Sequence, residues 1–376
     1  MDATRCFTQD PFAVRAYLGS GRSAVEKVYR VDYPQMVYAR KRFSLPEQHD
    51  VEQVRSIQRE ISIMRRLRHA HIVKFGGSYI CNNLLFVLLL PVADENMATF
   101  FRRTQSLPSN SPQRSLASRE MMQWPACLFR ALDYVHSMRI RHKDIKPSNI
   151  LIKDGRVILT DFGISKDFMD LTTSGTEGAA GAGTWMYMAP EVYEEQRRGR
   201  ATDVWGLGCV LLELCTILTG EATLDDFEQH RRAGRSGPLS GAYFTCSFRL
   251  FDWIWLLMGS LGQAWAFIGK TLALAFLMLD PDPQRRITTR QLVDLLNDPR
   301  CEDFHDIGTS ACDNCRRTIG MSPQDIPLHS IFKKGSNGQL VRPTKDGLTV
   351  ETQLLWEEIK VRWLKNHIWW AEDLWV

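Results

Sequence analysis

The stretch His142-Lys143-Asp144-Ile145-Lys146-Pro147-Ser148-Asn149 constrains this chain more than any other part of its sequence. Asp144, Lys146 and Asn149 place a carboxylate, an ammonium group and an amide within one loop. Such a set can meet a hydroxyl, a phosphate group and a hard metal ion together. Asp161-Phe162-Gly163 follows at the distance that one hairpin would span. The loop therefore requires partner residues that the rest of the chain has to supply.

A hairpin is indicated between this loop and Asp161. Ile150-Leu151-Ile152 and Val157-Ile158-Leu159 are apolar runs that flank the turn sequence Lys153-Asp154-Gly155. An Asp-Gly pair between two such runs is a strong signal for strand, turn and strand. The hairpin would place Asp161 at the end of a strand, where its side chain can face a cleft.

Taken with later motifs, the loop resembles the eukaryotic protein kinase family, serine/threonine type. The family pattern H-R-D-L-x-x-x-N followed by D-F-G is matched except at Lys143, where arginine is usual. Ala189-Pro190-Glu191 matches the A-P-E motif, and the resemblance covers about residues 11–298. Tyr38-Ala39-Arg40-Lys41 and Pro91-Val92-Ala93-Asp94 look similar to kinase-like proteins of filamentous fungi.

The resemblance implies an α+β, bilobal fold with a small β-rich N-lobe and a larger, mainly helical C-lobe. We expect the N-lobe over residues 11–92, the C-lobe over 93–298 and a C-terminal extension over 299–376. Residues 102–118 are rich in Ser, Pro, Arg and Gln and predict an exposed polar insertion. A helix should follow from about Arg119 to Met138, and Trp124-Pro125 should kink or delay it.

Leu18-Gly19-Ser20-Gly21 lies between two predicted strands and resembles the kinase glycine-rich loop. Glycines let backbone N–H groups approach phosphate oxygens because no Cβ stands in the way. Ala24 stands where a third glycine is usual, and Val25 comes one residue early. Taken alone, the segment fits a plain hairpin turn equally well. The resemblance implies that it covers the phosphates of a nucleotide.

An alternating strand carries Lys41, which resembles the lysine of the V-A-I-K motif. Ala39 and Lys41 should point the same way and Arg40 the other, although Lys41 could belong to a basic, solvated strand face. The helix expected over residues 50–68 carries Glu60 at the edge of its apolar stripe. The resemblance implies a Lys41–Glu60 ion pair that orients the α and β phosphates, with Ala39 on the adenine-facing surface.

The apolar run Leu84–Val92 resembles the strand and hinge that join the two lobes. By its spacing from Met97, Leu89 would be the gatekeeper residue. Pro91 lacks a backbone N–H, so the backbone of Val92 is our candidate for an adenine contact.

Three features of the second half are typical of the same family. Asp167–Gly183 resembles an activation loop, and Thr184 would bridge the aspartate and the lysine of the catalytic loop. Asp203 begins a strongly apolar helix and would hold the backbone of the catalytic loop. Arg286 matches the arginine that pairs with the A-P-E glutamate, Glu191.

The resemblance implies an ATP-dependent serine/threonine protein kinase that transfers the γ-phosphate of Mg-ATP to protein hydroxyls. Asp144 would accept the proton of the substrate hydroxyl or orient that hydroxyl, and Lys146 would neutralise charge on the γ phosphate. Asn149 and Asp161 would ligate Mg²⁺. The alternative is a weakly active kinase or pseudokinase scaffold that binds nucleotide and protein partners, which Ala24 and the shortened glycine loop leave open. A small-molecule kinase is disfavoured by the D-F-G and A-P-E motifs.

Lys143 is the informative departure from the family pattern. Arginine can grip a phosphorylated activation loop through its bidentate fork, whereas lysine keeps the charge without the fork. The hypothesis is that activation depends only weakly on phosphorylation of the loop, in which four hydroxyl residues are available: Thr172, Thr173, Ser174 and Thr176.

Net charge, the N-terminal residues and the cysteines together indicate the kind of partner and compartment to expect. A formal net charge of +4 in 376 residues argues for no nucleic-acid or membrane partner. Met1–Arg5 shows no apolar run after a basic region, so no secretory signal is expected. The nine cysteines have scattered spacing, which favours reduced thiols in the cytoplasm or nucleus. Within the apolar stretch Phe251–Leu279 we expect two buried helices instead of a membrane segment.

Beyond the kinase pattern, C-x-x-x-H and C-x-x-C follow each other at a spacing that could form a tetrahedral Zn²⁺ site. The candidate ligands are Cys301, His305, Cys312 and Cys315. Reduced, unpaired cysteines are the alternative. His69 and His71, earlier in the chain, are expected to pack instead of binding metal, as in the similar run of the kinase family.

The last segment, Thr349–Val376, is rich in tryptophan and predicts an amphipathic helix with aromatic anchors. It would pack onto the kinase lobe, or dock to a partner or a membrane surface.

Overall fold

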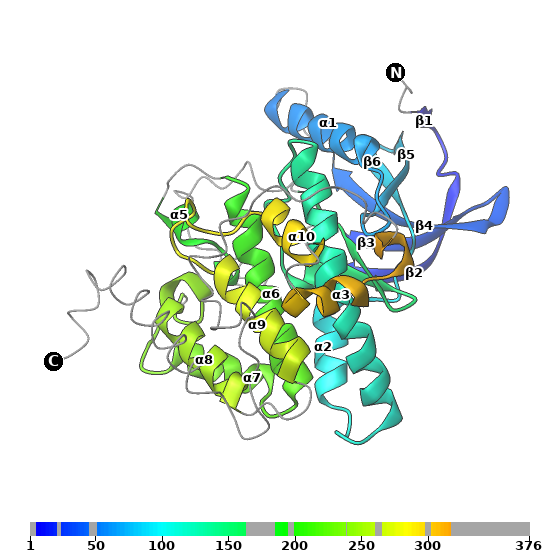
Figure 1. Ribbon diagram of the computed structural model, residues 1–376. Helices are drawn as coiled ribbons and strands as arrows, with labels where there is room; N and C mark the ends of the chain where they lie inside the picture. Colours follow the sequence, from blue (N-terminus) through cyan, green and yellow to red (C-terminus); the bar gives the residue numbers. More distant parts are fainter. Residues whose placement is uncertain are drawn as a thin grey trace.

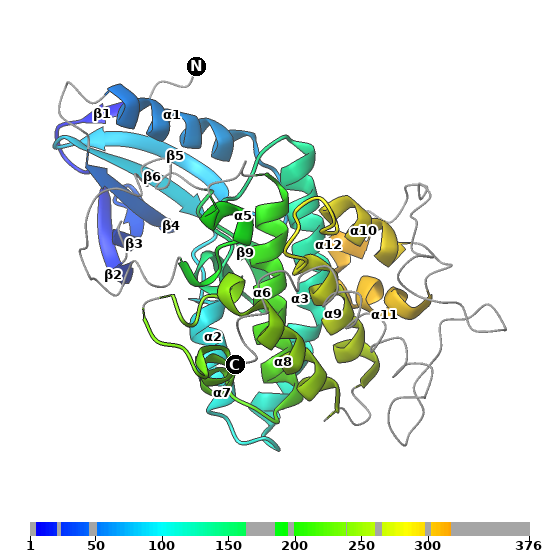
Figure 2. The same ribbon diagram turned by 90° about the vertical axis from the view of Figure 1, so that its left-hand side faces the viewer.

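A β-sheet and a helical body form the two lobes of the molecule, shown as a computed structural model in Figure 1. The structure describes residues 5–20, 24–44, 51–162, 185–194, 199–237, 239–259, 265–297 and 302–316. The sheet lies at one end with helix α1 (Val51–Arg66) beside it, and the other helices gather in the larger lobe (Figures 1 and 2). The expected α+β fold with a β-rich N-lobe and a helical C-lobe is therefore confirmed.

The N-lobe sheet has the strand order β1-β5-β6-β4-β3-β2. Its strands are β1 (Arg5–Phe7), β2 (Phe12–Ser20), β3 (Ala24–Arg30), β4 (Tyr33–Ser44), β5 (Lys74–Cys81) and β6 (Leu84–Leu90). Neighbouring strands are antiparallel except for β1, which pairs with β5 in parallel. Strand β1 was not predicted, because three residues are too few to show a readable alternation.

Strand β6 is apolar along its length because both of its faces are covered. On one face, alternate residues join α1 in the main core: Leu85, Val87 and Leu89 with Ile61, Met64 and Leu67. On the other face a smaller cluster forms from Phe86, Leu88, Val28, Tyr38 and Tyr79. The expected helix over residues 50–68 and its apolar stripe are confirmed by this packing.

Arg40 occupies the smaller-cluster side of the sheet. Its Nη2 donates to Glu26 Oε2 at 2.7 Å, and its Nη1 donates to the Tyr79 hydroxyl at 2.8 Å. Ala39, one residue earlier, belongs to the main core on the opposite face. Because strand residues alternate, Lys41 lies on the same side as Ala39, and it is buried. The predicted alternation is confirmed, and Lys41 does not belong to a solvated basic face.

A second, three-stranded sheet lies at the junction of the lobes, in the order β7-β8-β9. It contains β7 (Glu95–Asn96), β8 (Ile150–Lys153) and β9 (Arg156–Leu159). Asp154 and Gly155 have φ angles of +50° and +72°, as a two-residue turn between antiparallel strands requires. The predicted hairpin is confirmed, and its second strand ends two residues before Asp161.

The C-lobe is built around α6 (Ala201–Thr219), in which every residue from Asp203 to Ile217 is buried. Figure 2 shows α6 among its neighbours, and it contacts α2, α3, α7, α8 and α9. The remaining helices are α2 (Met97–Gln105), α3 (Pro112–Ser137), α5 (Pro190–Tyr193), α7 (Leu224–Arg232), α8 (Ser247–Gly259), α9 (Trp265–Met278), α10 (Thr289–Asn297), α11 (Glu302–Ser310) and α12 (Asp313–Arg316), with the 3-10 turns η1 (Pro147–Asn149) and η3 (Tyr243–Cys246).

Helix α6 is long and apolar enough to cross a membrane by length and composition alone. However, 83% of its apolar window is buried inside the fold, and core helices of soluble proteins pass the same test. The apolar stretch Phe251–Leu279 falls in α8 and α9, whose residues Leu257, Leu272 and Leu274 are fully buried. The two expected helices are confirmed, and the faces that carry these leucines are buried, whereas Trp255 and Leu256 of α8 are exposed.

Residues 102–118 are mostly exposed, as expected, but helices occupy much of the segment, so it is not an irregular insertion. Helix α2 continues to Gln105, and α3 begins at Pro112. The Ser111 hydroxyl accepts a hydrogen bond from Arg114 N at 3.1 Å, and Pro112 occupies the first turn. A serine N-cap followed by proline is a helix start signal that outweighs polar composition. Helix α3 also runs on through Pro125, so Trp124-Pro125 does not delay it.

The A-P-E glutamate and its predicted arginine form a buried, bidentate ion pair. Arg286 Nη1 lies 2.8 Å from Glu191 Oε1, and Arg286 Nη2 lies 3.0 Å from Glu191 Oε2. Both side chains are buried, so each charge depends on the other for compensation.

Replacing Arg286 with methionine should strand the Glu191 carboxylate in the core. We expect Arg286→Met to lower the free energy of unfolding by about 3–5 kcal/mol, measured by urea unfolding of the full chain. The matched control is Arg285→Met, because the Arg285 side chain is about half exposed and lies 3.5 Å from Asp280. Its effect should stay below about 1 kcal/mol. Equal effects of the two variants would contradict the assigned role of the pair.

Candidate active site

The backbone of the catalytic loop is held by one buried carboxylate at the start of α6. Asp203 Oδ2 accepts from His142 N at 2.8 Å, and Asp203 Oδ1 accepts from Lys143 N at 2.7 Å. His136 Nε2 lies 2.9 Å from Asp203 Oδ2 and adds a contact from α3. The role predicted for Asp203 is confirmed by these contacts.

The side chains of the loop converge on Asp144. Lys146 Nζ lies 3.0 Å from Asp144 Oδ2. Asn149 Nδ2 donates to the Asp144 backbone oxygen at 2.8 Å and to its Oδ2 at 3.0 Å. The three residues that the sequence spacing singled out therefore share one small site, with the carboxylate at its centre.

Two residues of this region have left-handed backbone conformations. Lys143 has φ +70° and Asp161 has φ +62°, values that non-glycine residues seldom adopt. Lys143 is exposed, so its backbone serves the loop while its side chain faces outward. Strained backbone of this kind persists only where surrounding contacts hold it, and it gathers at functional sites.

His142 is fully buried beneath the loop and contacts Phe162, with ring centroids 4.8 Å apart. Burial lowers the pKa of the His142 imidazole below its ordinary value, although the carboxylates of Asp203, Asp144 and Asp161 oppose that shift. The imidazole therefore stays neutral and supports the loop as a packed ring.

Lys41 reaches the site from β4. Its Nζ forms an ion pair with Asp161 Oδ1, which joins the N-lobe sheet to the residue that follows the hairpin. Its expected partner Glu60 lies in α1, but the side chain of Glu60 is outside the described atoms. The Lys41–Glu60 pair stays a prediction.

The residues expected around a nucleotide lie on the same strands. Ala39 pairs with Leu89 across β4 and β6, and both are buried in the main core. Gly19 pairs with Val25 at the end of the β2–β3 ladder. Of the other candidates, Leu18 is exposed and Val92 is half-buried. Ser20 is described by its backbone alone, and Gly21 and Thr184 lie outside the described residues.

The donor set suits a hard cation. The Asp161 carboxylate and the Asn149 amide oxygen are the oxygen ligands that Mg²⁺ prefers. Thr160 N donates to Asn149 O at 3.1 Å, so the backbone beside Asp161 is tied to Asn149. Since Asn149 Nδ2 donates to Asp144, the side-chain oxygen is the atom of this amide that could bind a cation. Asn149 and Asp161 therefore fit the metal that the sequence predicted.

A second cluster of functional side chains lies away from this site. The predicted zinc residues Cys312 and Cys315 meet His71 and Cys127, and the ligand atoms of all four lie within 4.8 Å of one another. Cys301 and the side chain of His305 lie outside the described atoms. Sequence reasoning missed Cys127, a lone cysteine in α3, and assigned His71 to packing. Both histidines pack as expected: His69 stacks on Tyr134 with ring centroids 5.3 Å apart, and His71 is buried.

Proton sharing makes this cluster electrostatically unusual. The hydrogen bond from Cys315 lowers the pKa of the Cys127 thiol to about 4; burial opposes the shift and a hydrogen bond from His71 adds to it. Burial and the same hydrogen bond raise the pKa of the Cys315 thiol well above its ordinary value. The contact between the two thiols thus shifts their pKa values in opposite directions.

Comparison with known families identifies the fold. The description "Protein kinase domain" matches residues 12–295, about three quarters of the chain. This chain belongs to the protein kinase family. The kinase resemblance read from the catalytic loop is thereby confirmed.

Three relatives illustrate where this kinase stands. It is 35% identical over 164 residues to serine/threonine-protein kinase 36 of Pongo abelii, 43% of this chain and 12% of that protein. It is 33% identical over 197 residues to serine/threonine-protein kinase TIO of Arabidopsis thaliana, 52% of this chain and 14% of that protein. It is 32% identical over 182 residues to serine/threonine-protein kinase Nek1 of Mus musculus, 48% of this chain and 14% of that protein. The similarity therefore concerns a small part of each relative.

Gly206 of α6 lets the kinase's central helix approach the catalytic loop. A Cβ at this position would lie 2.9 Å from Ile145 O, a backbone atom that cannot swing away. We expect Gly206→Ala to lower the free energy of unfolding by about 1–3 kcal/mol. It should also reduce the rise in thermal midpoint that we expect on addition of Mg-ATP, because the loop carrying Asn149 must move.

Gly199→Ala is the matched control for this test. The nearest atom to a Cβ there is Ala201 N at 3.8 Å, an ordinary contact. Both readouts should match the wild type. If Gly206→Ala also behaves like the wild type, the close approach of α6 to the loop does not limit the site.

Proposed function

We propose that this kinase transfers the γ-phosphoryl group of ATP to serine or threonine hydroxyls of proteins. The observation that carries the proposal is the convergence of Lys146 and Asn149 on the Asp144 carboxylate, with the Lys41–Asp161 ion pair joining the second lobe. Phosphoryl transfer asks a protein mainly for positioning and for charge neutralisation, and this arrangement can supply both.

In the proposed reaction the substrate hydroxyl oxygen forms a bond to the γ-phosphorus of ATP. The bond from that phosphorus to the β,γ-bridging oxygen breaks, and ADP leaves with the electron pair. Asp144 orients the hydroxyl and takes up its proton. Lys146 neutralises charge on the transferred group, and its Nζ lies 3.0 Å from Asp144 Oδ2.

We assign the nucleotide to the strands that meet at the lobe junction. Lys41, oriented by Glu60, would bind the α and β phosphates, and Leu18-Gly19-Ser20-Gly21 would cover them. Ala39, the gatekeeper Leu89 and the backbone of Val92 would face the adenine ring. Mg²⁺ held by Asn149 and Asp161 would supply further neutralisation of the phosphate oxygens.

Specificity for serine and threonine is supported by Lys146, two residues after Asp144, and by the names of the related kinases. Thr184 would bridge Asp144 and Lys146, another feature typical of that class. The fungal affinity suggested by two short phrases stays a prediction. So does the division into an N-lobe over 11–92, a C-lobe over 93–298 and an extension over 299–376.

A weakly active kinase or scaffold is the second candidate, favoured by the glycine segment. Ser20 pairs directly with Ala24, so strands β2 and β3 are paired up to the residues on either side of 21–23. A ladder that runs this far leaves few backbone N–H groups for phosphate oxygens. Weak nucleotide binding together with little transfer would favour this candidate.

We also propose a cytoplasmic or nuclear location and a partner-docking role for the tryptophan-rich segment 349–376, which lies outside the described residues. The location is supported by the cysteines, because no disulfide is formed among the eight that lie in the described residues.

The decisive experiment is transfer of labelled γ-phosphate from Mg-ATP to a generic protein substrate. We expect Asp144→Asn to reduce kcat by about 10²–10⁴-fold, because the hydroxyl loses its proton acceptor. Lys41→Met should also suppress transfer, with weaker nucleotide binding. The matched controls are Asp154→Asn, in the exposed hairpin turn, and Lys74→Met, on an exposed position of β5. Unchanged transfer in Asp144→Asn would overturn the site assignment.

A second test addresses Lys143. Because lysine lacks the bidentate fork of arginine, we expect phosphatase treatment to lower transfer activity by less than about tenfold. Alanine at all four loop hydroxyls (Thr172, Thr173, Ser174 and Thr176) should have a similarly small effect. Abolished activity after phosphatase treatment would show that the loop must be phosphorylated.

A further inference from the structure

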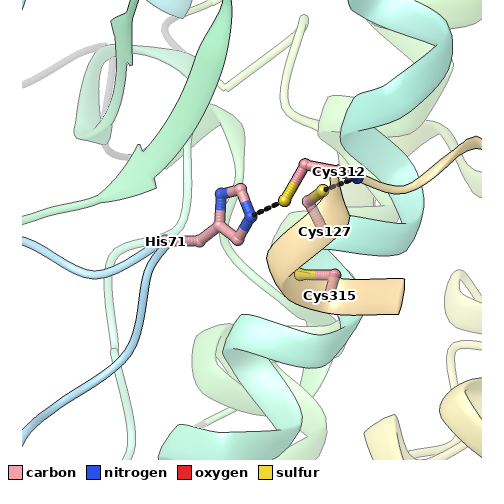
Figure 3. A group of neighbouring side chains, drawn as sticks. All are labelled: His71, Cys127, Cys312 and Cys315. Atoms are coloured by element: carbon pink, nitrogen blue, oxygen red, sulfur yellow. Dashed lines mark hydrogen bonds between the residues drawn. The ribbon is translucent and has the colours of Figure 1, made fainter. Parts of the chain in front are cut away.

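The second cluster joins three distant parts of the chain. His71 lies between α1 and β5, Cys127 lies in α3, and Cys312 and Cys315 lie at α12, beyond the matched kinase domain. Figure 3 shows the four side chains pointing toward one another from these elements. His71, Cys127 and Cys315 are buried, and Cys312 is half-buried. A site of this kind is closed by protein on most sides.

The spacing of the donor atoms fits a tetrahedral ion. Bonds of about 2.3 Å to sulfur and about 2.0 Å to nitrogen place tetrahedral ligand atoms about 3.5–3.8 Å apart. All four donor atoms lie within 4.8 Å of one another, and His71 Nε2 lies 3.1 Å from Cys312 Sγ. Small side-chain shifts would therefore bring the four atoms onto one tetrahedron without movement of the helices.

The histidine is oriented as a zinc ligand. His71 Nδ1 lies 2.6 Å from Val157 O, so Nδ1 carries the proton and donates to that carbonyl. Nε2 is then the nitrogen that faces the cysteines, and it can bind a metal ion once it has given up any proton it carries. Metal-bound histidines usually have their second nitrogen held in this way.

The cysteine pair also has the local geometry of a metal-binding turn. Cys315 N donates to Cys312 O at 2.9 Å, which folds the C-x-x-C segment into one turn and brings both sulfurs to the same side. The backbone N–H of Cys312 donates to Cys127 Sγ at 3.5 Å, a hydrogen bond that would stabilise a thiolate on Cys127.

Charge at the cluster is balanced by Arg130, one turn after Cys127 in α3. Its guanidinium is buried, and its Nη2 donates to Asn297 Oδ1 at 2.9 Å. Its buried Nη1 has no hydrogen-bond partner among the described residues. A Zn²⁺ ion with three thiolates and one neutral imidazole keeps one negative charge, which this cation would offset.

We propose that His71, Cys127, Cys312 and Cys315 form a structural Zn²⁺ site that fastens the segment after the kinase domain to both lobes. Four protein ligands without an open position are typical of structural, as opposed to catalytic, zinc. The ion replaces the thiol protons, which are released to solvent on binding. This ligand set differs from the one expected from sequence, since His71 and Cys127 take the places of Cys301 and His305.

The site would also steady the active site. His71 O accepts from Leu159 N at 2.8 Å, and Val73 N donates to Leu159 O at 3.0 Å. Leu159 ends β9, two residues before Asp161. Zinc at His71 would therefore hold the α1–β5 connection against the strand that presents Asp161.

The first test measures metal in the purified full chain by plasma mass spectrometry. We expect about one zinc per chain in the wild type, as one closed four-ligand site requires. His71→Ala, Cys127→Ser and Cys312→Ser/Cys315→Ser should each lose at least nine tenths of it. His69→Ala, Cys301→Ser and His305→Ala are matched controls and should keep it. Loss of zinc in Cys301→Ser or His305→Ala would overturn the ligand set in favour of the sequence-based one.

A second measurement uses only the wild type, in case the variants fail to fold. Chelation followed by Co²⁺ should give the visible absorption of a tetrahedral thiolate site, displaced by Zn²⁺. Alkylation mapped by mass spectrometry should label Cys127, Cys312 and Cys315 at least tenfold faster after chelation than before. Absent zinc with an octahedral Co²⁺ spectrum, or equal alkylation before and after chelation, would overturn the proposal. None of these readouts depends on kinase activity.

Discussion

The contact on which the active site depends is the grip of the Asp203 carboxylate on the catalytic loop. Two consecutive backbone N–H groups, those of His142 and Lys143, donate to its two oxygens. Hydrogen bonds to a buried charge are short and strong, and two of them fix orientation as well as distance. Because Asp203 begins the buried helix α6, the loop takes its rigidity from the centre of the C-lobe. The left-handed backbone at Lys143 is held in place by the same contact.

Contacts from both lobes meet at a short stretch of backbone beside Asp161. Lys41 reaches Asp161 from the N-lobe sheet, while β9 leads to Asp161 from the hairpin. The same strand is bonded to the backbone at His71 and Val73, which connects it to α1 and β5. A metal at His71 would thus act on the active site through hydrogen-bonded backbone. Such a site would couple the attachment of the C-terminal segment to the position of the residues proposed to bind nucleotide.

Much of the fold could be predicted, because it rests on local signals. The alternation of Ala39, Arg40 and Lys41 follows from strand geometry, and the structure places Arg40 on the opposite face, as expected. The Asp154-Gly155 turn has its own sequence signature. Ordered family motifs predicted the long-range Glu191–Arg286 pair and the role of Asp203. The polar composition of residues 102–118 indicated that the segment is exposed, but it did not indicate the start of α3, which depends on the N-cap at Ser111.

By itself, the sequence determined the family, the two-lobed fold and the set Asp144, Lys146 and Asn149, since these depend on residue type and short spacing. Only the tertiary structure decided which groups surround the C-terminal cysteines. Cys127 is a single residue on an apolar helix face, and nothing in its local pattern separates it from other buried cysteines. His71 and Cys312 are 241 positions apart, and a distance of that kind is set by how helices pack. Periodicity and spacing carry no information about such a meeting, because it arises only when the lobes and the extension close around a common centre.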